Sequence, residues 1–340
     1  MPTNQGFDYF FGYLDQSHAH LFYPTFLIRN EDRVPLKNVV PNEGRWGQGI
    51  ASEKVEYAPD LMIDETLGFI DRKKNEPFFL YLSYTLPHAN NEAWNETGDG
   101  TAVPDLGVYE NKPWTKQNKG QAAMVTYLDM MVGKVVERLE DHDLIENTVI
   151  FFTSDNGPHS EAGNDPRFFD ANGPLSGIKR ALYDGGIRVP LIVQWKGKIE
   201  PGTTSSLVSG QVDFMATAVD VAGDDVEIPT NGISFLPTLL GNDSEQIKHE
   251  YLYWEFYEQG SKQALRMGKW KAVRRPMLTG QIEIYDVTQD PAEENDLGKR
   301  RPEMVETFER IFQNARTPSD WQVRGSLNSP EQERREFRQR

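Results

Sequence analysis

The spacing of apolar side chains along the first two thirds of the chain predicts alternating helices and strands. The predicted helices, which place apolar residues every three or four positions, are 57–74, 121–140 and 211–222. The predicted strands, which are short apolar runs, are 25–29, 78–84, 148–153 and 189–194. The last three have the composition of buried strands in a parallel sheet, and residues 87–118 are predicted to form one long polar loop. This alternation predicts an α/β domain with helices on both faces of a doubly wound sheet.

A different pattern follows residue 248. Short segments alternate apolar and polar residues between turns, which predicts an antiparallel sheet. These segments are 251–256, 263–267, 269–274 and 281–286, and a helical pattern follows at 302–314. We expect a main α/β domain over 1–245, a C-terminal antiparallel-sheet subdomain with a closing helix over 246–317, and a charged tail over 318–340.

The composition is that of a folded protein, with 26% charged and 11% aromatic residues among 340. A net charge of −16 predicts no nucleic-acid partner, because phosphate neutralisation needs a basic surface. Cysteine is absent, which removes disulfides, thiolate metal ligands and a thiol nucleophile. No apolar run reaches the roughly 18 residues of a membrane span. The first residues lack the basic and apolar regions of a signal peptide, so the compartment stays open.

Asp155 and Asn156 follow the predicted strand at 148–153 and precede Gly157. Ligands of doubly wound sheets bind at the carboxyl ends of strands. A carboxylate beside an amide oxygen suits a hard cation such as calcium or magnesium. In isolation, Asp-Asn-Gly indicates an Asx turn. The motifs that follow make a metal site the better interpretation.

Lys179 lies in the glycine-rich stretch Gly173-Pro-Leu-Ser-Gly177-Ile-Lys179. A lysine ammonium suits a tetrahedral oxyanion, and glycines allow the backbone to approach a ligand closely. On composition alone, Lys179 would be an ordinary solvated lysine.

Four histidines are candidates for the same cleft. His88 follows the predicted strand at 78–84, where an imidazole can donate to an anion or protonate a leaving oxygen. A single histidine is more often a structural hydrogen bonder. On a strand, the spacing of His18 and His20 would point both the same way. A transition metal there is disfavoured because a third ligand is lacking. His159 lies four residues after Asp155.

Taken together, these segments resemble the formylglycine-dependent sulfatases of the alkaline phosphatase superfamily. The matching segments are 6–13, 18–20, 77–88, 153–159, 173–179, 183–190, 268–271 and 284–297. The resemblance covers nearly the whole chain. It implies an alkaline-phosphatase-like doubly wound sheet, N-terminally incomplete, with a small C-terminal antiparallel sheet plus helix.

The resemblance implies a role for each matched residue. Asp155 and Asn156 correspond to two calcium ligands, and Lys179 to the sulfate-binding lysine of the Gly-x-Lys loop. His88 corresponds to the histidine that contacts sulfate and helps the bridging oxygen leave. His159 and His20 correspond to substrate-cleft residues. The implied reaction is hydrolysis of a sulfate ester, with a sulfated polysaccharide favoured over a small aryl ester as substrate.

Parts of the family pattern have no counterpart in these 340 residues. They are an acidic pair of calcium ligands, the Cys- or Ser-x-Pro-x-Arg segment that provides the formylglycine nucleophile, and a Lys-x-His pair. We therefore interpret the sequence as the C-terminal two thirds of a sulfatase. We expect weak calcium binding, no turnover by this chain alone, and an exposed sheet face that favours aggregation.

Two alternatives stay open. A non-catalytic protein would bind sulfated glycans through Lys179 and His88. A phosphate-transfer relative would use a serine or threonine nucleophile from outside these residues. Family members are typically periplasmic, secreted or lysosomal, although this chain shows no signal peptide.

Overall fold

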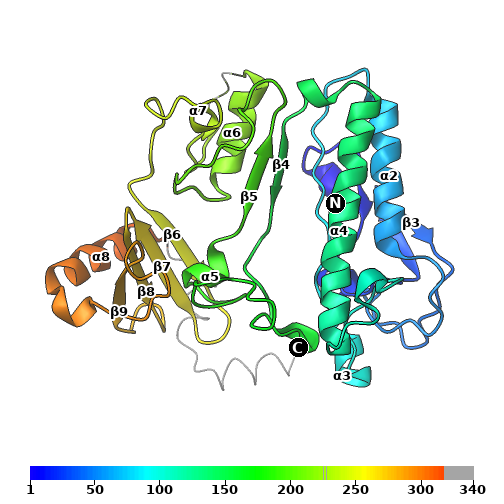
Figure 1. Cartoon of the computed structure of the whole chain (residues 1–340), viewed down its shortest axis with the longest axis horizontal. Coiled ribbons are helices and arrows are strands. Elements are labelled where there is room, and N and C mark those ends of the chain that lie inside the picture. The colour runs from blue at the N-terminus through cyan, green and yellow to red at the C-terminus, as the bar shows by residue number, and fades with distance from the viewer. Residues whose placement is uncertain (225, 227, 318–340) are drawn as a thin grey trace. The chain divides into compact units, whose positions relative to one another are not determined.

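The computed structural model describes residues 1–224, 226 and 228–317, which form two compact units (Figure 1). The first unit consists of residues 1–148 with 159–169, and the second of residues 149–158 with 170 onward. The chain therefore leaves the first unit to build one strand of the second, and it returns before the second unit is completed.

The first unit contains both helices and short strands. Its elements are η1 (Pro2–Asn4), β1 (Phe11–Gly12), α1 (Gln16–Ala19), β2 (Phe26–Arg29), β3 (Asp32–Pro35), α2 (Ala58–Lys73), α3 (Asn91–Thr97), η2 (Gly107–Tyr109), α4 (Lys116–Asp141), η3 (Ile145–Asn147) and η4 (Glu161–Gly163). The strands form an antiparallel sheet in the order β1-β2-β3. Helices α2 and α4 pack side by side (Figure 1).

The sequence explains where α4 begins and which face it buries. Thr115 at the N-cap accepts a hydrogen bond from the backbone N–H of Asn118 at 3.2 Å, which satisfies one of the free donors of the first turn. Met124, Met131 and Leu139 recur at helical spacing and are almost completely buried. Each such side chain contributes about 1.5–3 kcal/mol through burial.

The second unit ends in an antiparallel sheet covered by a helix. Its elements are β4 (Ile150–Thr153), α5 (Asp184–Ile187), β5 (Leu191–Gln194), α6 (Asp213–Ala222), α7 (Leu236–Leu239), β6 (Leu252–Phe256), β7 (Lys262–Met267), β8 (Trp270–Arg274), β9 (Ile282–Asp286), η5 (Gly298–Arg300) and α8 (Pro302–Asn314). Strands β6 to β9 pair in sequence order. Phe308 and Phe312 of α8 pack on Leu265 and Ile284 of the sheet.

The structure confirms most predicted elements. Helices α2, α4, α6 and α8 and strands β2, β4, β5 and β6–β9 lie where the sequence places them. The α/β class, with a small antiparallel sheet and helix toward the C-terminus, is confirmed. The domain limits at residues 245 and 317 stay predictions, and the charged tail over 318–340 lies outside the described residues.

The predicted strand at 78–84 is wrong. These residues form no strand, and Phe79 and Tyr81 are 57% and 68% exposed. A strand requires hydrogen bonds to a neighbouring strand, and no strand that the structure describes pairs with this segment. An apolar run suits a strand inside a sheet. It carries no information, however, on whether a neighbouring strand is available to pair with it.

Two further expectations need correction. Strands β4 and β5 are antiparallel rather than parallel, with Phe151 opposite Val193. In β5, the consecutive residues Leu191 and Ile192, which point to opposite faces of the sheet, are 44% and 61% exposed rather than buried. The segment 87–118 is not one long loop. It contains α3, because Asn90 caps the helix by accepting a hydrogen bond from the N–H of Ala93 at 2.9 Å.

Candidate functional site

Three of the predicted histidines form a stack in the first unit. The rings of His20 and His88 are nearly parallel, with an interplanar angle of 8° and centroids 4.9 Å apart. The ring of His159 continues the stack on His88 at 5.9 Å and 22°. His20 is the C-cap of α1, whereas His88 and His159 lie in loops. Segments that are far apart in the sequence thus place three imidazoles together.

Two glutamates pair with this histidine stack. Glu92, in the first turn of α3, lies 3.1 Å from Nδ1 of His20. Glu161, the first residue of η4, lies 3.3 Å from Nε2 of His88. Sequence reasoning missed both glutamates. Glu92 falls in the segment that was interpreted as a loop, and the one available signal for Glu161 was its position two residues after His159.

Hydrogen bonds fix His159 as a neutral imidazole. The backbone N–H of Glu161 donates to Nδ1 of His159 at 3.1 Å, so Nδ1 carries a lone pair. Nε2 lies 3.3 Å from the carbonyl oxygen of Pro87, which only accepts, so the ring proton is on Nε2. Asn164 holds this segment by donating to the carbonyl oxygen of His159 at 2.7 Å.

The ring nitrogens of His88 differ from those of His159 in their partners, since both face acceptors. Its Nδ1 lies 2.8 Å from the carbonyl oxygen of Ala89 and must donate to it. Its Nε2 faces the Glu161 carboxylate. Acceptors at both ring nitrogens favour the imidazolium form, because only that form donates from both. Within the stack, both ring nitrogens of His88 thus face acceptors, whereas Nδ1 of His159 accepts a hydrogen bond.

His18 does not belong to this stack. It lies inside α1 and is 2% exposed, with its ring against those of Tyr13 at 4.8 Å and Phe26 at 4.5 Å. Burial lowers the pKa of His18, which favours the neutral ring. The spacing of His18 and His20 suggested one face of a strand. The helical turn makes His18 a core residue and leaves His20 with Glu92.

Asp155 and Asn156 follow β4 after one intervening residue, Ser154, in the second unit. The backbone N–H of Gly157 donates to the carbonyl oxygen of Gly186 at 2.9 Å. A Cβ atom at position 157 would lie 1.9 Å from the carbonyl oxygen of Gly185, so only glycine fits. This close crossing fixes the backbone next to the two oxygen-bearing side chains.

The Lys179 loop packs against the same turn. The backbone N–H of Lys179 donates to the carbonyl oxygen of Pro158 at 2.8 Å. Gly177 has a φ of +85°, which favours glycine, and its carbonyl oxygen accepts from Asn172 at 2.9 Å. In the second unit, the structure thus brings Lys179 next to the turn that follows Asp155 and Asn156.

A buried ionic cluster anchors this loop region to the C-terminal sheet. The carboxylate of Asp184 lies 2.6 Å from Nζ of Lys271, which is fully buried in β8, and 3.5 Å from Arg266 of β7. The backbone N–H of Asp184 donates to Glu293 at 2.6 Å. Burial raises the pKa of Glu293 to about 7, although the charge of Lys271 opposes this.

The oxygen donors of Asp155 and Asn156 match the chemistry of calcium, but they are two of the roughly 6–8 oxygens it prefers. Among the residues that the structure describes, no group of three or more histidine, aspartate or glutamate side chains is arranged to hold a metal. None of the described helices combines the length and apolar character that a membrane crossing requires.

Comparison with known proteins places these features in a family. The family model described as Sulfatase matches residues 1–224, about two thirds of the chain. The chain belongs to the sulfatase family. A second model, described as N-sulphoglucosamine sulphohydrolase, C-terminal, matches residues 177–316 of this sulfatase-family chain. This match includes the Lys179 loop and the C-terminal sheet.

Individual relatives agree with this assignment. An uncharacterized sulfatase, YdeN, of Escherichia coli (strain K12) is 33% identical over 74% of this chain and 40% of its own length. An N-acetylgalactosamine-6-O-sulfatase of Bacteroides thetaiotaomicron is 27% identical over 82% of this chain and 55% of its own. This sulfatase-family chain therefore spans about half the length of these curated relatives.

A solved structure shows the same fold. The crystal structure of Ps i-CgsB in complex with k-i-k-neocarrahexaose is 25% identical, with a TM-score of 0.71 over 97% of this chain and 69% of that chain. The alkaline-phosphatase-like fold expected from the sequence is thereby confirmed for this sulfatase-family chain.

Proposed function

We propose that this chain binds a sulfate ester. It would supply two parts of a sulfatase centre, namely the group that protonates the leaving oxygen and the group that holds the sulfate. The observation that carries the proposal is the surroundings of His88: its Nδ1 is hydrogen-bonded to a backbone carbonyl and its Nε2 lies beside the Glu161 carboxylate, which together favour a proton donor. Nδ1 is held by a backbone carbonyl at 2.8 Å, whereas the contact at Nε2 is longer, at 3.3 Å. Nε2–H is therefore the proton that His88 can release to the ester oxygen that leaves with the alcohol.

Lys179 has the complementary role of holding the sulfate oxygens. Its ammonium is a compact positive charge, and the glycines at 157 and 177 fix the backbone around it. His20 and His159 are proposed to contact the substrate beside His88. Their hydrogen bonds to Glu92 and Pro87 keep the rings oriented.

Asp155 and Asn156 are proposed to provide two of the ligands of a calcium ion. A bound calcium would supply positive charge that stabilises the sulfate oxygens. A formylglycine does not fit these residues, because the sequence contains no cysteine and no Ser-x-Pro-x-Arg segment from which to form one. We therefore assign to this chain binding and proton donation, and predict that the 340 residues alone do not turn over a sulfate ester.

The proposed substrate class is a sulfated glycan. It rests on the relative named as an N-acetylgalactosamine-6-O-sulfatase and on the solved structure in complex with k-i-k-neocarrahexaose. An alternative within this class is a protein that binds sulfated glycans without any catalytic role. Both functions require Lys179, and hydrolysis alone requires the His88 proton.

Calorimetric titration with N-acetylgalactosamine 6-sulfate in the presence of calcium tests the proposal. We expect binding by the full chain, at least about tenfold weaker in Lys179→Ala because a charge-assisted contact is lost. Lys198→Ala, a change of another lysine in the same unit, should bind as the unaltered chain does. Equal affinity in the full chain and Lys179→Ala would refute the role of Lys179.

A turnover assay tests the remaining claim. The same chain, incubated with an aryl sulfate and with the sulfated sugar, should release no inorganic sulfate, because it lacks a cysteine-derived nucleophile. Sulfate release above the rate of a heat-denatured sample would show that the chain has a complete centre.

A further inference from the structure

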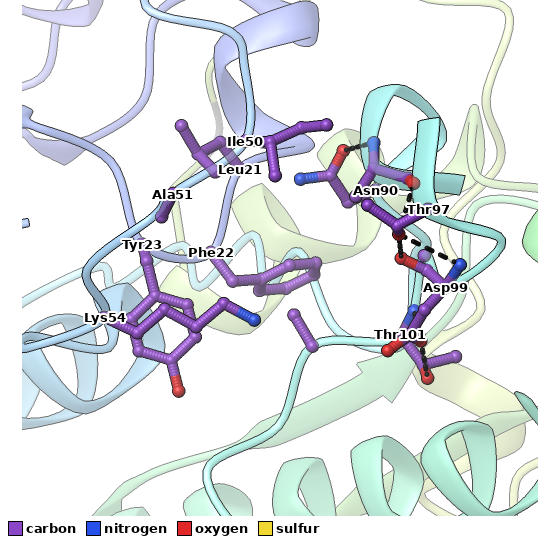
Figure 2. A pocket seen from close by; sticks show the side chains of 13 residues that line it. Leu21, Phe22, Tyr23, Ile50, Ala51, Lys54, Asn90, Thr97, Asp99 and Thr101 are labelled. Carbon is purple, nitrogen blue, oxygen red and sulfur yellow. Dashed lines mark hydrogen bonds between the residues drawn. The ribbon is translucent and has the colours of Figure 1, made fainter. Parts of the chain in front are cut away.

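A cavity of about 190 Å³ lies inside the first unit (Figure 2). Its walls are the segments 21–23 and 50–54, helix α3, and the turn that follows α3. Leu21 directly follows His20, and Ala93 directly follows Glu92. At about 30 Å³ per water the volume corresponds to about six waters, which is room for one ring-sized group.

One wall of this cavity is aromatic. Phe22 is completely buried and Tyr23 is 7% exposed. Tyr23 is held in place by the ring of Tyr57 at 5.1 Å, and the Tyr57 hydroxyl donates to the carbonyl oxygen of Ala102 at 2.8 Å. These contacts make the wall rigid, and the Tyr23 ring supports the Lys54 ammonium at the edge of the cavity.

The opposite wall is polar and prearranged. Asp99 accepts hydrogen bonds from the backbone N–H and the hydroxyl of Thr101 at 3.2 and 3.0 Å. Its second oxygen pairs with Lys116 at 2.7 Å, and these partners lower the pKa of Asp99 despite the opposing effect of burial. Asp99 is therefore ionised, and its charge is balanced by Lys116. Its hydrogen bonds to Thr101 hold the turn in place.

Two side chains that line the cavity, Asn90 and Lys54, can still donate hydrogen bonds to a ligand. Asn90 is 4% exposed, and its amide nitrogen makes a single long hydrogen bond, 3.4 Å to the carbonyl oxygen of Gly49, among the described residues. Lys54 lies over the ring of Tyr23, with Nζ 5.4 Å from the centroid, and within the described part of the chain no carboxylate pairs with it. Figure 2 shows both side chains directed toward the space beside the Phe22 ring.

We propose that this cavity binds an anionic sugar ring, with its carboxylate or sulfate at Lys54 and a hydroxyl at Asn90. The positive charge of Lys116 is matched by Asp99, so the charge of Lys54 is the one left uncompensated among these groups. An uncompensated ammonium beside aromatic rings selects an anion with an apolar face. The inference rests on the proposed function, in which a sulfated glycan lies at the adjoining histidines and its neighbouring unit enters the cavity.

Saturation-transfer NMR with the full chain tests this cavity. The probes are glucuronic acid, glucose 6-sulfate and glucose. Both acidic sugars, or one of them, should bind at least about tenfold more tightly than glucose. Lys54→Gln should remove that preference, while Lys74→Gln, a change of another lysine of the same unit, should keep it. A preference for only one acid identifies carboxylate or sulfate as the group at Lys54.

Two results would overturn the proposal. One is equal binding of glucose and the acids; the other is an acid preference that survives in Lys54→Gln. The second variant Ala93→Leu narrows the cavity from α3 without touching a charge, and it should weaken all binding. Lys179→Ala separates this inference from the proposed function. Binding of glucuronic acid should persist in it even if the Lys179 loop turns out to have no part in sulfate binding.

Discussion

Glu161 contacts two of the stacked histidines through different groups. Its backbone N–H donates to Nδ1 of His159, and its carboxylate faces Nε2 of His88. One residue thereby helps to hold His159 neutral while it favours the imidazolium form of His88. Histidine protonation in the stack is thus decided by single hydrogen bonds rather than by burial alone.

Replacing this carboxylate should change the state of His88. In Glu161→Gln, the backbone N–H that holds His159 is kept, but the negative charge beside His88 is lost. We expect His88 to convert at pH 7 from the doubly protonated ring to the neutral ring with its proton on Nδ1, which remains bonded to Ala89. Long-range ¹H–¹⁵N NMR of the ring nitrogens measures this directly.

The matched control is Glu92→Gln, which removes the carboxylate beside His20 instead. It should leave the His88 nitrogens unchanged. A neutral His88 in the unaltered chain at pH 7, or a doubly protonated one in Glu161→Gln, would contradict the assignment.

The elements that carry the site differ in how far the sequence predicts them. Helix α4 was predicted over 121–140 because its apolar stripe is a local signal, whereas its start after the Thr115 cap was not predicted. The glycine crossing at Gly157 was not, since it depends on the carbonyl of Gly185, which is distant in sequence. His88, His159 and His20 were individually named from the sequence. Their stacking and their glutamate partners follow from tertiary packing, which no periodicity encodes.

At the crossing between β4 and α5, Gly157→Ala should be strongly destabilising. The new methyl group would lie 1.9 Å from the carbonyl oxygen of Gly185, so the backbone must shift, at a cost of about 1–3 kcal/mol. Chemical denaturation measures this loss. Gly133→Ala on α4, where a Cβ would meet no atom within 4 Å, should instead be neutral or slightly stabilising.

The free energy of unfolding should depend strongly on Lys271, which lies in the buried ionic cluster between α5 and the C-terminal sheet. Lys271→Met removes the fully buried ammonium beside Asp184 and Glu293 and leaves Asp184 with the longer Arg266 contact, so it should lower the free energy of unfolding by about 3–5 kcal/mol. Lys269→Met removes an exposed pair with Asp286 and should cost at most about 1 kcal/mol. Similar losses in both variants would argue against the cluster as an anchor.

Glu293 should also make stability depend on pH. Its pKa is raised by burial from 4.5 to about 7, so between these values the folded state holds a proton that the unfolded state has released. The contribution of Glu293 to stability is therefore present below about pH 4.5 and is lost as pH rises toward 7. The stability of Glu293→Gln relative to the unaltered chain should rise over this range. A pH-independent difference would contradict the raised pKa.

On the scale of the whole molecule, solubility is set by opposing features. A net charge of −16 disfavours association, whereas β4 and β5 pair only with each other among the described strands and expose Ile192 of β5 at 61%. An exposed apolar strand edge is a site for intermolecular pairing. The aggregation expected from the sequence stays a prediction, and β5 is the strand at which we expect it to begin.

Ile192→Lys should reduce aggregation without loss of stability, because the side chain is already exposed. Size-exclusion chromatography with light scattering measures the monomer fraction. Ile247→Lys changes an apolar residue that is 70% exposed but lies outside any strand, and it should have a smaller effect. An equal gain from both variants would indicate that added charge alone, rather than the strand edge, controls association.

The central claim is that His88 and Lys179 each contact a bound sulfate ester. It is tested most directly by following the ¹⁵N signals of the His88 ring and the Lys179 ammonium while the full chain is titrated with N-acetylgalactosamine 6-sulfate and calcium. The account predicts that both signals shift in a saturable manner with the sulfated sugar and remain in place with N-acetylgalactosamine. Signals that do not respond to the sulfated sugar, or that respond equally to both sugars, would contradict it.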